Sequence, residues 1–367
     1  MKYSPVHNSL CRALGEPLRP LGFKIKYLLP QSLDWTVPQA QFEGTTFVGS
    51  SRNGKEVLWD TFAMITRRRR QLRRLLEEIH PSLLLFEASH PANRIVASLA
   101  RSTVPGIKIW MLLHEPYVHE KSKHGGVRRF LISAHEWGVR QLLPYLDGLL
   151  VPSAEAMRRM EKAYPGFHGN VLKIPLLFED RSITDNSTRH YFSFIGHAVP
   201  AKGIDTFFEL VRTSAELGRH WSFQIATSSN ISGYFSALPD ATRTRLKVIS
   251  KPRLRDEEID QAIRESWAVL APYRRVTQSG VVPVAFMHGT PVISTRAGGM
   301  LEFVVEGETG HLVNLDAEFS EWEDKFCQVQ FNFSQLSTNC RRFFLDYFDA
   351  NRGPEFLRPV LDPINAK

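Results

Sequence analysis

Short apolar runs alternate along the chain with longer segments in which apolar residues recur every three or four positions. The alternation is clear where the run Pro81–Phe86 is followed by a helical pattern at Asn93–Ser102 and by a second run at Ile107–Leu113. An apolar run, an amphipathic helix and another apolar run are typical of a βαβ unit. We therefore predict an α/β protein with parallel sheets.

The alternation passes through two cycles. The predicted strands are 23–29, 81–86, 107–113, 147–151 and 170–174, then 191–195, 221–226, 247–250, 268–271, 291–294 and 310–313. The predicted helices are 65–79, 93–102, 128–143 and 154–163, then 204–217, 256–266, 281–288, 300–304, 318–330 and 340–348. We expect one domain over residues 1–178, a second over 190–340, and a helix and tail over 341–367 that could cross back to the first. Ligands of such domains bind beyond the carboxyl ends of the strands, here toward a cleft between the two sheets.

The composition is that of a globular protein, with 43% hydrophobic and 23% charged residues. No apolar run reaches the ~18 residues of a membrane span, and no secretory signal is visible, so we expect a cytoplasmic protein. The three cysteines lie far apart in the sequence and have no metal-ligand spacing. The net charge of +8 indicates an anionic partner.

The densest positive charge lies at Arg67–Arg74, within the predicted helix Thr66–Ile79. One interpretation is an amphipathic helix that packs its leucines against the core and leaves its basic face in solvent. The other is peripheral contact with an anionic membrane at its inner face, which would suit an acceptor carried on a lipid. Nucleic acid is not an expected partner, because no nucleic-acid-binding module is recognisable.

The segment Pro272–Val313 contains the best candidates for binding chemistry. A small polar loop, Thr277–Gly280, opens the helix predicted after the strand that ends at Ala271. The backbone N–H groups at a helix start attract anions, and Gly280 would let a phosphate approach the backbone. Gln278 and Ser279 could add side-chain hydrogen bonds. The alternative is a simple capped helix start, with Ser279 as the cap and nothing bound.

A second loop of small residues, Ala297-Gly298-Gly299, follows the strand predicted at 291–294, and Glu302 comes one helical turn later. Two such loops side by side could hold a diphosphate and a sugar. A carboxylate suits sugar or ribose hydroxyls because it accepts hydrogen bonds in pairs. The alternative for Glu302 is a solvated carboxylate near a helix start.

The chain resembles a known family through three stretches, which read FSFIGHAVPAKGIDTFFELV, PYRRVTQSG and HGTPVISTRAGGMLEFVVEGETGHLV. In order and spacing they are similar to the C-terminal signature of the group 1, family 4-like, retaining glycosyltransferases. The resemblance covers roughly Leu83–Val313 and is strongest after Tyr191. It implies the GT-B fold, two Rossmann-like domains with parallel sheets facing a central cleft. It also implies a nucleoside-diphosphate sugar as the donor substrate, with no permanently bound cofactor or metal.

The resemblance assigns further donor-binding residues. Lys202 matches the lysine that binds the donor phosphate, where a cation would stabilise the leaving group. Gly196 matches the glycine that ends the first strand of the donor domain. His197 stands where the family commonly has an arginine, and a histidine can still donate to phosphate. The remaining direct matches are Gly298, Gly299 and Glu302.

The chain departs from the family at a pair of glutamates spaced E-x7-E in many members. Val276 and Val284 occupy these positions when the sequences are aligned on Gly289. The chain thus resembles the sub-group that has TQSG in this loop. Thr277, Gln278 and Ser279 are the nearest polar side chains that could replace the two carboxylates.

In the first half, His114-Glu115-Pro116-Tyr117-Val118-His119 follows a predicted strand and should lie at its carboxyl end. In the family this region lies near the anomeric carbon and the acceptor, so the resemblance makes His114, Glu115 and His119 candidate catalytic residues. The alternative is that some of them only hold the loop together. Weaker candidates after the preceding strand are Glu87 and His90. Relative to the family, the first strand of this domain is missing or reduced.

The leading hypothesis is a retaining glycosyltransferase that moves a sugar from a nucleoside-diphosphate sugar to a glycan or lipid-linked acceptor in surface polysaccharide biosynthesis. In the family, a front-face attack needs no strong base, because the leaving phosphate accepts the acceptor's proton. The main alternative is a non-catalytic relative that binds a sugar nucleotide or acts as a scaffold, which the two valines favour. A sugar-nucleotide epimerase of the same fold ranks lower, and a nucleic-acid-binding protein lowest.

Overall fold

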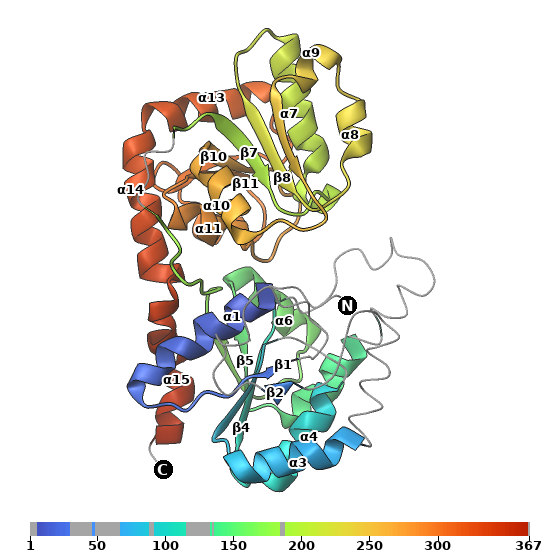
Figure 1. Ribbon diagram of the computed structural model, residues 1–367, viewed down its shortest axis with the longest axis vertical. Coiled ribbons are helices and arrows are strands. Elements are labelled where there is room, and N and C mark those ends of the chain that lie inside the picture. The colour runs from blue at the N-terminus through green and yellow to red at the C-terminus, as the bar shows by residue number, and fades with distance from the viewer. Residues whose placement is uncertain are drawn as a thin grey trace. The chain divides into compact units, whose positions relative to one another are not determined.

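The computed structural model describes residues 6–29, 46–47, 67–87, 92–114, 133, 136–183 and 188–365. The chain divides into two compact units, as Figure 1 shows. The N-terminal unit consists of Met1–Glu179 together with Ala350–Lys367, and the C-terminal unit is Asp180–Asp349.

The N-terminal unit is built on a four-stranded parallel sheet in the order β3-β4-β5-β6. These strands are β3 (Leu83–Phe86), β4 (Lys108–Leu112), β5 (Gly148–Val151) and β6 (Asn170–Lys173). Two further strands pair with each other, β1 (Leu28–Leu29) and β2 (Thr46–Phe47). The helices of the unit are α1 (Val6–Gly15), η1 (Glu16–Leu21), α3 (Arg67–Ile79), α4 (Asn93–Thr103), η4 (Leu143–Tyr145), α6 (Ala154–Ala163), η7 (Ala350–Arg352) and α15 (Gly353–Asn365).

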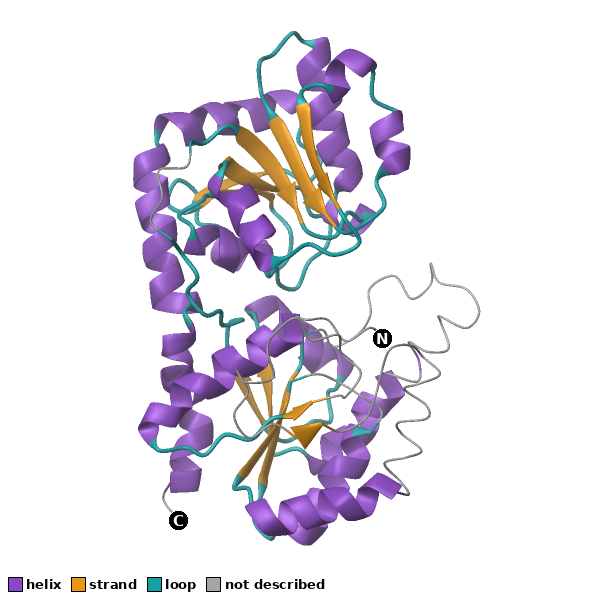
Figure 2. Cartoon of the chain, in the orientation of Figure 1, coloured by secondary structure: helices purple, strands orange, loops and turns teal. Residues whose placement is uncertain are grey.

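Helices cover both faces of this sheet (Figure 2), which explains why β3 and β5 are continuously apolar and β4 is apolar after Lys108. Ile109 and Met111 of β4 point into one core, which they share with residues of α3, α4 and α6. Trp110 and Leu112 point the other way, into a core shared with α1 and α15. The sequence from Lys108 to Leu112 therefore supplies both cores by simple alternation.

The arginine-rich helix α3 is amphipathic. Leu72 and Leu76 are buried in the core, whereas Arg69, Arg70 and Arg73 are exposed. Within the described parts of the chain, no helix is long and apolar enough to cross a membrane.

The C-terminal unit contains a six-stranded sheet in the order β12-β11-β10-β7-β8-β9, in which all neighbours are parallel. Its strands are β7 (Tyr191–Ile195), β8 (Phe223–Thr227), β9 (Leu246–Ser250), β10 (Ser266–Ala271), β11 (Val292–Thr295) and β12 (Gly310–Val313). The strand order reverses between β7 and β10, so this doubly wound sheet has its switch point at those two strands. In such sheets the ligand crevice lies beyond the carboxyl ends of the strands at the switch point.

Helices also flank the second sheet (Figure 2). They are η5 (Pro200–Lys202), α7 (Ile204–Glu216), α8 (Ser232–Ser236), α9 (Asp240–Arg243), α10 (Asp256–Arg264), α11 (Val281–Met287), α12 (Met300–Phe303), α13 (Phe319–Phe331), α14 (Phe333–Phe343) and η6 (Phe344–Phe348). Phe192 of β7 stacks on Phe326 of α13 with ring centroids 4.2 Å apart, in a core rich in aromatic side chains.

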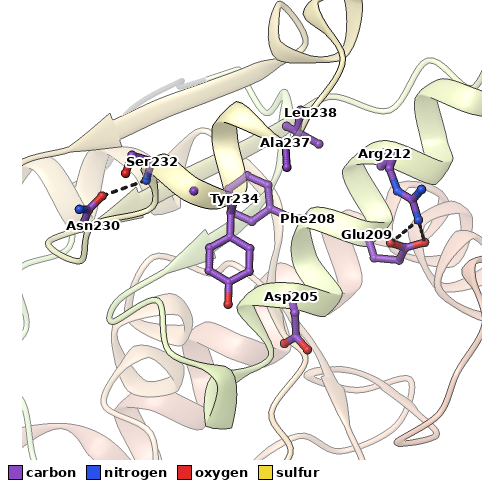
Figure 3. Close-up of a pocket in the computed structure, with 10 residues that line it drawn as sticks. Asp205, Phe208, Glu209, Arg212, Asn230, Ser232, Tyr234, Ala237 and Leu238 are labelled. Atoms are coloured by element: carbon purple, nitrogen blue, oxygen red, sulfur yellow. Dashed lines mark hydrogen bonds and ion pairs between the residues drawn. The ribbon is translucent and has the colours of Figure 1, made fainter.

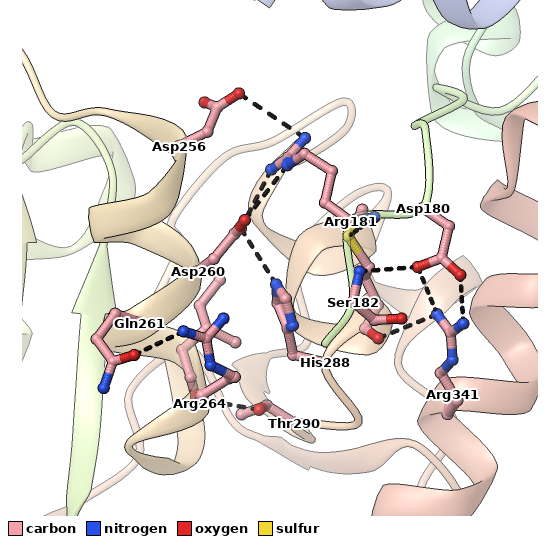
Figure 4. A network of polar contacts seen from close by, with 12 residues as sticks. Asp180, Arg181, Ser182, Asp256, Asp260, Gln261, Arg264, His288, Thr290 and Arg341 are labelled. Atoms are coloured by element: carbon pink, nitrogen blue, oxygen red, sulfur yellow. Dashed lines mark hydrogen bonds and ion pairs between the residues drawn. The ribbon is translucent and has the colours of Figure 1, made fainter. Parts of the chain in front are cut away.

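The chain enters the C-terminal unit through a group of ion pairs, which Figure 4 shows. Arg181 Nη2 lies 3.1 Å from Oδ1 of the buried Asp260 in α10, and His288 Nε2 lies 3.1 Å from the same oxygen. Asp180 pairs with Arg341 of α14 through both carboxylate oxygens. The first residues of the unit are thereby fixed to two of its helices.

The two parallel-sheet units agree with the predicted fold class, and most predicted elements are confirmed to within a few residues. The strand predicted over 23–29 is wrong except for Leu28–Leu29. Part of the helix predicted over 128–143 lies outside the described residues. The helices α1, α8, α9 and α15 were not predicted, and the helix predicted over 340–348 begins earlier, at Phe333 of α14. Pro359 and Pro363 argue against a helix at α15, yet the burial of its Leu357 and Leu361 holds it in place.

Candidate functional site

The residues expected to bind a donor gather at one edge of the C-terminal sheet. They follow the carboxyl ends of β7, β10 and β11, which are adjacent in the sheet. Those after β7 are Gly196, His197 and Lys202, those after β10 are Gln278, Ser279 and Gly280, and those after β11 are Gly298, Gly299 and Glu302. Because β7 and β10 flank the switch point, this edge is where a doubly wound sheet binds its ligand.

Gly196 and Lys202 lie next to each other. Gly196 has φ +111°, a conformation that side chains disfavour, and a Cβ at this position would lie 3.9 Å from Lys202 Nζ. Lys202 ends the short helix η5 and is half-buried. Among the described residues, no carboxylate lies within ion-pair distance of its ammonium group. In the described part of the chain, the Lys202 ammonium thus lies beside the backbone of a glycine and has no carboxylate partner.

A close backbone contact joins the segment that carries Lys202 to the loop after β10. Gly203 has φ +67°, and a Cβ there would lie 1.9 Å from the carbonyl oxygen of Pro272. The Arg274 N–H donates to the Ala201 carbonyl at 3.0 Å. Only glycine allows the two loops to approach this closely.

Tyr273 lies between these loops and is 2% exposed. The Lys202 ammonium sits over its ring, 5.4 Å from the centroid. Its hydroxyl is 3.2 Å from Ser279 Oγ, and its carbonyl accepts a hydrogen bond from the Thr295 hydroxyl at the end of β11. A residue that follows β7, a residue that follows β10 and the last residue of β11 therefore all contact this one tyrosine.

The loop Val276–Gly280 packs on the loop Ala297–Gly299. The Gly299 N–H donates to the Val276 carbonyl at 3.1 Å, and a Cβ at Gly299 would lie 2.1 Å from the Thr277 carbonyl oxygen. Gly280 is the N-cap residue of α11, which has no side-chain cap, so the alternative in which Ser279 caps this helix is wrong. Gln278 Oε1 is buried and accepts no hydrogen bond within the described part of the chain.

Glu302 is half-buried in α12, and its Oε1 accepts a hydrogen bond from the Tyr347 hydroxyl at 3.3 Å. The carboxylate is therefore tied to η6 and is not simply solvated. His197 is next to the site, and its pKa is lowered by desolvation and by the positive charge of Lys202. A lowered pKa favours the neutral ring near pH 7, in contrast to the permanently charged arginine expected from the family.

Three arginines at the same edge were not predicted as site residues. Arg274 and Arg275 follow β10, and Arg296 follows β11. Arg274 pairs with Asp205, whereas Arg275 and Arg296 are exposed and have no ion-pair partner among the described residues. Their position directly after predicted strands was the signal that could have identified them.

In the N-terminal unit, His114 and Glu87 follow the neighbouring strands β4 and β3. His114 Nε2 lies 3.0 Å from Glu87 Oε1, and Glu87 is 7% exposed. This histidine, expected from the sequence, is thus paired with an acid that ranked as a weaker candidate. Glu115, His119 and His90 lie outside the described residues.

A surface hollow of about 590 Å³ lies beside α7 and α8 (Figure 3). It is lined by Asp205, Phe208, Glu209, Arg212, Asn230, Ser232, Gly233, Tyr234, Ala237 and Leu238. The rings of Phe208 and Tyr234 stack with centroids 5.3 Å apart. None of the predicted site residues lines this hollow. The candidate site is therefore the group of loops at the carboxyl ends of β7, β10 and β11.

Residues 189–329 match the family described as Glycosyl transferases group 1. The matched range includes every donor-binding residue expected from the sequence. No curated protein matches the chain.

Several solved structures are similar to the whole chain or to most of it. HepE of Anabaena, solved in complex with UDP, has a TM-score of 0.69 and 13% identity, with 99% of this chain and 97% of that chain covered. Sucrose-phosphate synthase of Thermosynechococcus elongatus has a TM-score of 0.66 and 13% identity, with 97% and 92% covered. TarM has a TM-score of 0.61 and 12% identity, with 80% of this chain but only 57% of TarM covered. At these identities the similarity concerns the fold, and with the two parallel-sheet units it shows a GT-B fold.

Proposed function

We propose that the chain is a glycosyltransferase that moves a sugar from a nucleoside-diphosphate sugar to a glycan or lipid-linked acceptor. The observation that carries the proposal is the position of Lys202. Its ammonium group lies beyond the carboxyl end of β7, beside Gly196 and beside Tyr273 of the loop after β10, in the part of the chain that matches the group 1 glycosyltransferases. A phosphate at this edge would meet a cation and closely packed glycine loops.

In this proposal the loop residues hold the diphosphate and Lys202 stabilises the charge that develops as the sugar leaves. Such stabilisation by a fixed cation is a major source of rate enhancement in transfer reactions. The donor-binding residues are then Gly196, His197, Lys202, Gln278, Ser279, Gly280, Gly298, Gly299 and Glu302. The donor needs no permanently bound cofactor. HepE was solved with UDP and with UDP-glucose, so uridine nucleotides are the first donors to test.

We further propose that transfer retains the anomeric configuration, as in the family that the sequence resembles. His114, Glu115 and His119 remain the proposed residues on the acceptor side. The proximity of His114 and Glu87 supports a polar site at the carboxyl ends of β3 and β4. A lipid-linked acceptor in surface polysaccharide synthesis would suit the exposed arginines of α3, which could contact anionic lipid.

The proposal is tested by calorimetric titration with UDP, GDP, ADP and dTDP, using the wild type and Lys202→Ala. A hydrogen bond to a charged group contributes about 1.5–3 kcal/mol, so we expect Lys202→Ala to weaken binding of the preferred nucleotide roughly 10- to 100-fold. Lys162→Ala is the matched control, because Lys162 is exposed on α6 and forms no ion pair within the described residues. Equal affinity of Lys202→Ala and the control, or no binding by the folded wild type, would contradict the proposal.

The second candidate function is a non-catalytic protein that binds a sugar nucleotide. It is favoured by Val276 and Val284, which are 6% and 7% exposed and offer no carboxylate for sugar hydroxyls. If the protein binds a sugar nucleotide but neither hydrolyses it nor transfers its sugar to glycan acceptors, this second function is supported over the first.

A further inference from the structure

The side chain of Tyr273 makes two polar contacts that a purely space-filling residue would not need, and its backbone carbonyl makes a third that does not depend on the side chain. One face of its ring lies under the Lys202 ammonium, its hydroxyl contacts Ser279, and its carbonyl accepts from Thr295. The side chain is 2% exposed, so its position is set by packing and not by solvent. Tyr273 thus joins the lysine after β7 to the loop that opens α11.

The ring contact restricts a side chain that would otherwise be flexible. A lysine has four rotatable bonds, and a free ammonium must lose much of that freedom when it binds a phosphate. An aromatic face within about 6 Å attracts the cation without using its N–H donors. The ammonium is therefore held in place while its donors remain available to an anion.

The backbone around Tyr273 fixes the same geometry. Gly203 approaches the Pro272 carbonyl directly, and the Arg274 N–H bonds to Ala201, so the residues on both sides of Tyr273 are joined to the segment that carries Lys202. The hydroxyl of Ser279 is held at the other end of the tyrosine ring. A shift of the ring would move the cation and the loop together.

We propose that Tyr273 is a positioning residue of the phosphate site, which fixes the Lys202 ammonium with its ring and Ser279 with its hydroxyl. The inference rests on the proposed function, since it assumes that a nucleoside diphosphate binds at this edge. Tyr273 acts through Lys202 and need not touch the ligand. Its effect is therefore expected on diphosphate affinity, and only where Lys202 is present.

The first test replaces Tyr273 by phenylalanine carrying no, one, two or three ring fluorines. Fluorination weakens the negative face of the ring with little change in shape, so the protein should fold as the Tyr273→Phe variant does. Affinity is measured by calorimetry for UDP, or for whichever of GDP, ADP and dTDP the wild type binds. The corresponding nucleoside, which lacks phosphates, is the control ligand. The same series is made in the Lys202→Ala background.

We expect the dissociation constant for the diphosphate to rise stepwise with fluorination, to about two- to tenfold at three fluorines. The series should be flat for the nucleoside and flat in Lys202→Ala. Tyr273→Leu should weaken diphosphate binding more than Tyr273→Phe, with thermal unfolding checking that the variant is folded. The coupling between Tyr273 and Ser279 is measured separately, with Tyr273→Phe, Ser279→Ala and the double variant. The losses of affinity in the two single variants should not add up in the double variant.

If Lys202→Ala weakens diphosphate binding but the affinity does not change along the fluorine series with Lys202 present, the inference is overturned and the proposed function still stands. A stepwise gain in affinity would also overturn it, because the ring would then compete with phosphate for the ammonium. Equal losses with and without Lys202 would show a merely structural role. Absence of diphosphate binding by the wild type would instead refute the proposed function, and this inference with it.

Discussion

Replacing Gly203 by alanine should destabilise the C-terminal unit more than any ordinary helix-flanking glycine would. Gly203 has φ +67°, and a Cβ would stand 1.9 Å from the carbonyl oxygen of Pro272. The left-handed conformation alone costs a non-glycine residue about 1–2 kcal/mol. The overlap with a backbone oxygen must be relieved by moving the chain, at about 1–3 kcal/mol for an overpacked site. We expect a total loss of about 2–5 kcal/mol.

Gly218→Ala is the matched control. Gly218 has φ +64° and follows the same helix, α7, at its other end, but no atom lies within 4 Å of a Cβ there. It should pay only for the left-handed conformation, about 1–2 kcal/mol. The difference between the two variants therefore measures the close approach of Gly203 to Pro272.

Thermal unfolding followed by circular dichroism measures both variants, because both glycines lie in the same unit. At about 2–4 °C per kcal/mol, Gly203→Ala should lower the transition by about 4–20 °C and Gly218→Ala by about 2–8 °C. Gly203→Ala should also weaken nucleotide binding, since relief of the overlap moves Lys202. Equal shifts in the two variants would refute the reasoning, because they would mean that the loops do not meet as closely as described.

Two further predictions concern buried ionisable groups in the C-terminal unit. Burial would by itself raise the pKa of Asp260, but the contacts from His288 and Arg181 outweigh it and hold the pKa below its ordinary value of 3.8. The ionised Asp260 therefore stabilises the folded state above pH 3.8, and this stabilisation is lost as the pH falls through the lower pKa of the folded state. Asp260→Asn should lower the free energy of unfolding by about 3 kcal/mol at pH 7. Below pH 4, the stability of this variant should depend less on pH than that of the wild type. An unchanged acid limb in urea titrations would contradict this. Cys327 is exposed, whereas burial raises the pKa of Cys340 well above its ordinary value. A thiol reagent should therefore label Cys327 in the native protein and Cys340 only on unfolding, and mass spectrometry of the labelled peptides would show the reverse if the assignment is wrong.

The strands of the C-terminal unit could be predicted from sequence because each is a short apolar run that ends at a small or polar loop. β7 and β12 were predicted at their observed bounds, and β10 was predicted two residues too short. The order of the strands could not be read from such runs, because pairing depends on contacts between distant segments. Only the structure places the ends of β7, β10 and β11 side by side.

The part that Tyr273 plays could not be predicted for a similar reason. In sequence it stands in the run Pro272-Tyr273-Arg274-Arg275, where the arginines draw attention and the tyrosine does not. Its importance comes from Lys202, 5.4 Å above its ring but remote in the chain. In the N-terminal unit the sequence identified His114 as a candidate, but only the structure shows that Glu87 is its partner.

Under the proposed function, Val276 and Val284 would leave the site without two carboxylates while the backbone frame of the two loops is kept. Val276 and Val284 are buried, where an unpaired carboxylate would be costly. The loop still holds the second loop through the backbone of Val276, whose carbonyl accepts from the Gly299 N–H, and this bond does not depend on the side chain. The packing of the two loops is thus independent of these side chains, which offer no acceptor to a hydroxyl group. If the proposed function holds, the two loops serve nucleotide binding and other groups hold the sugar, so nucleotide affinity tests the donor site and a transfer assay must follow it.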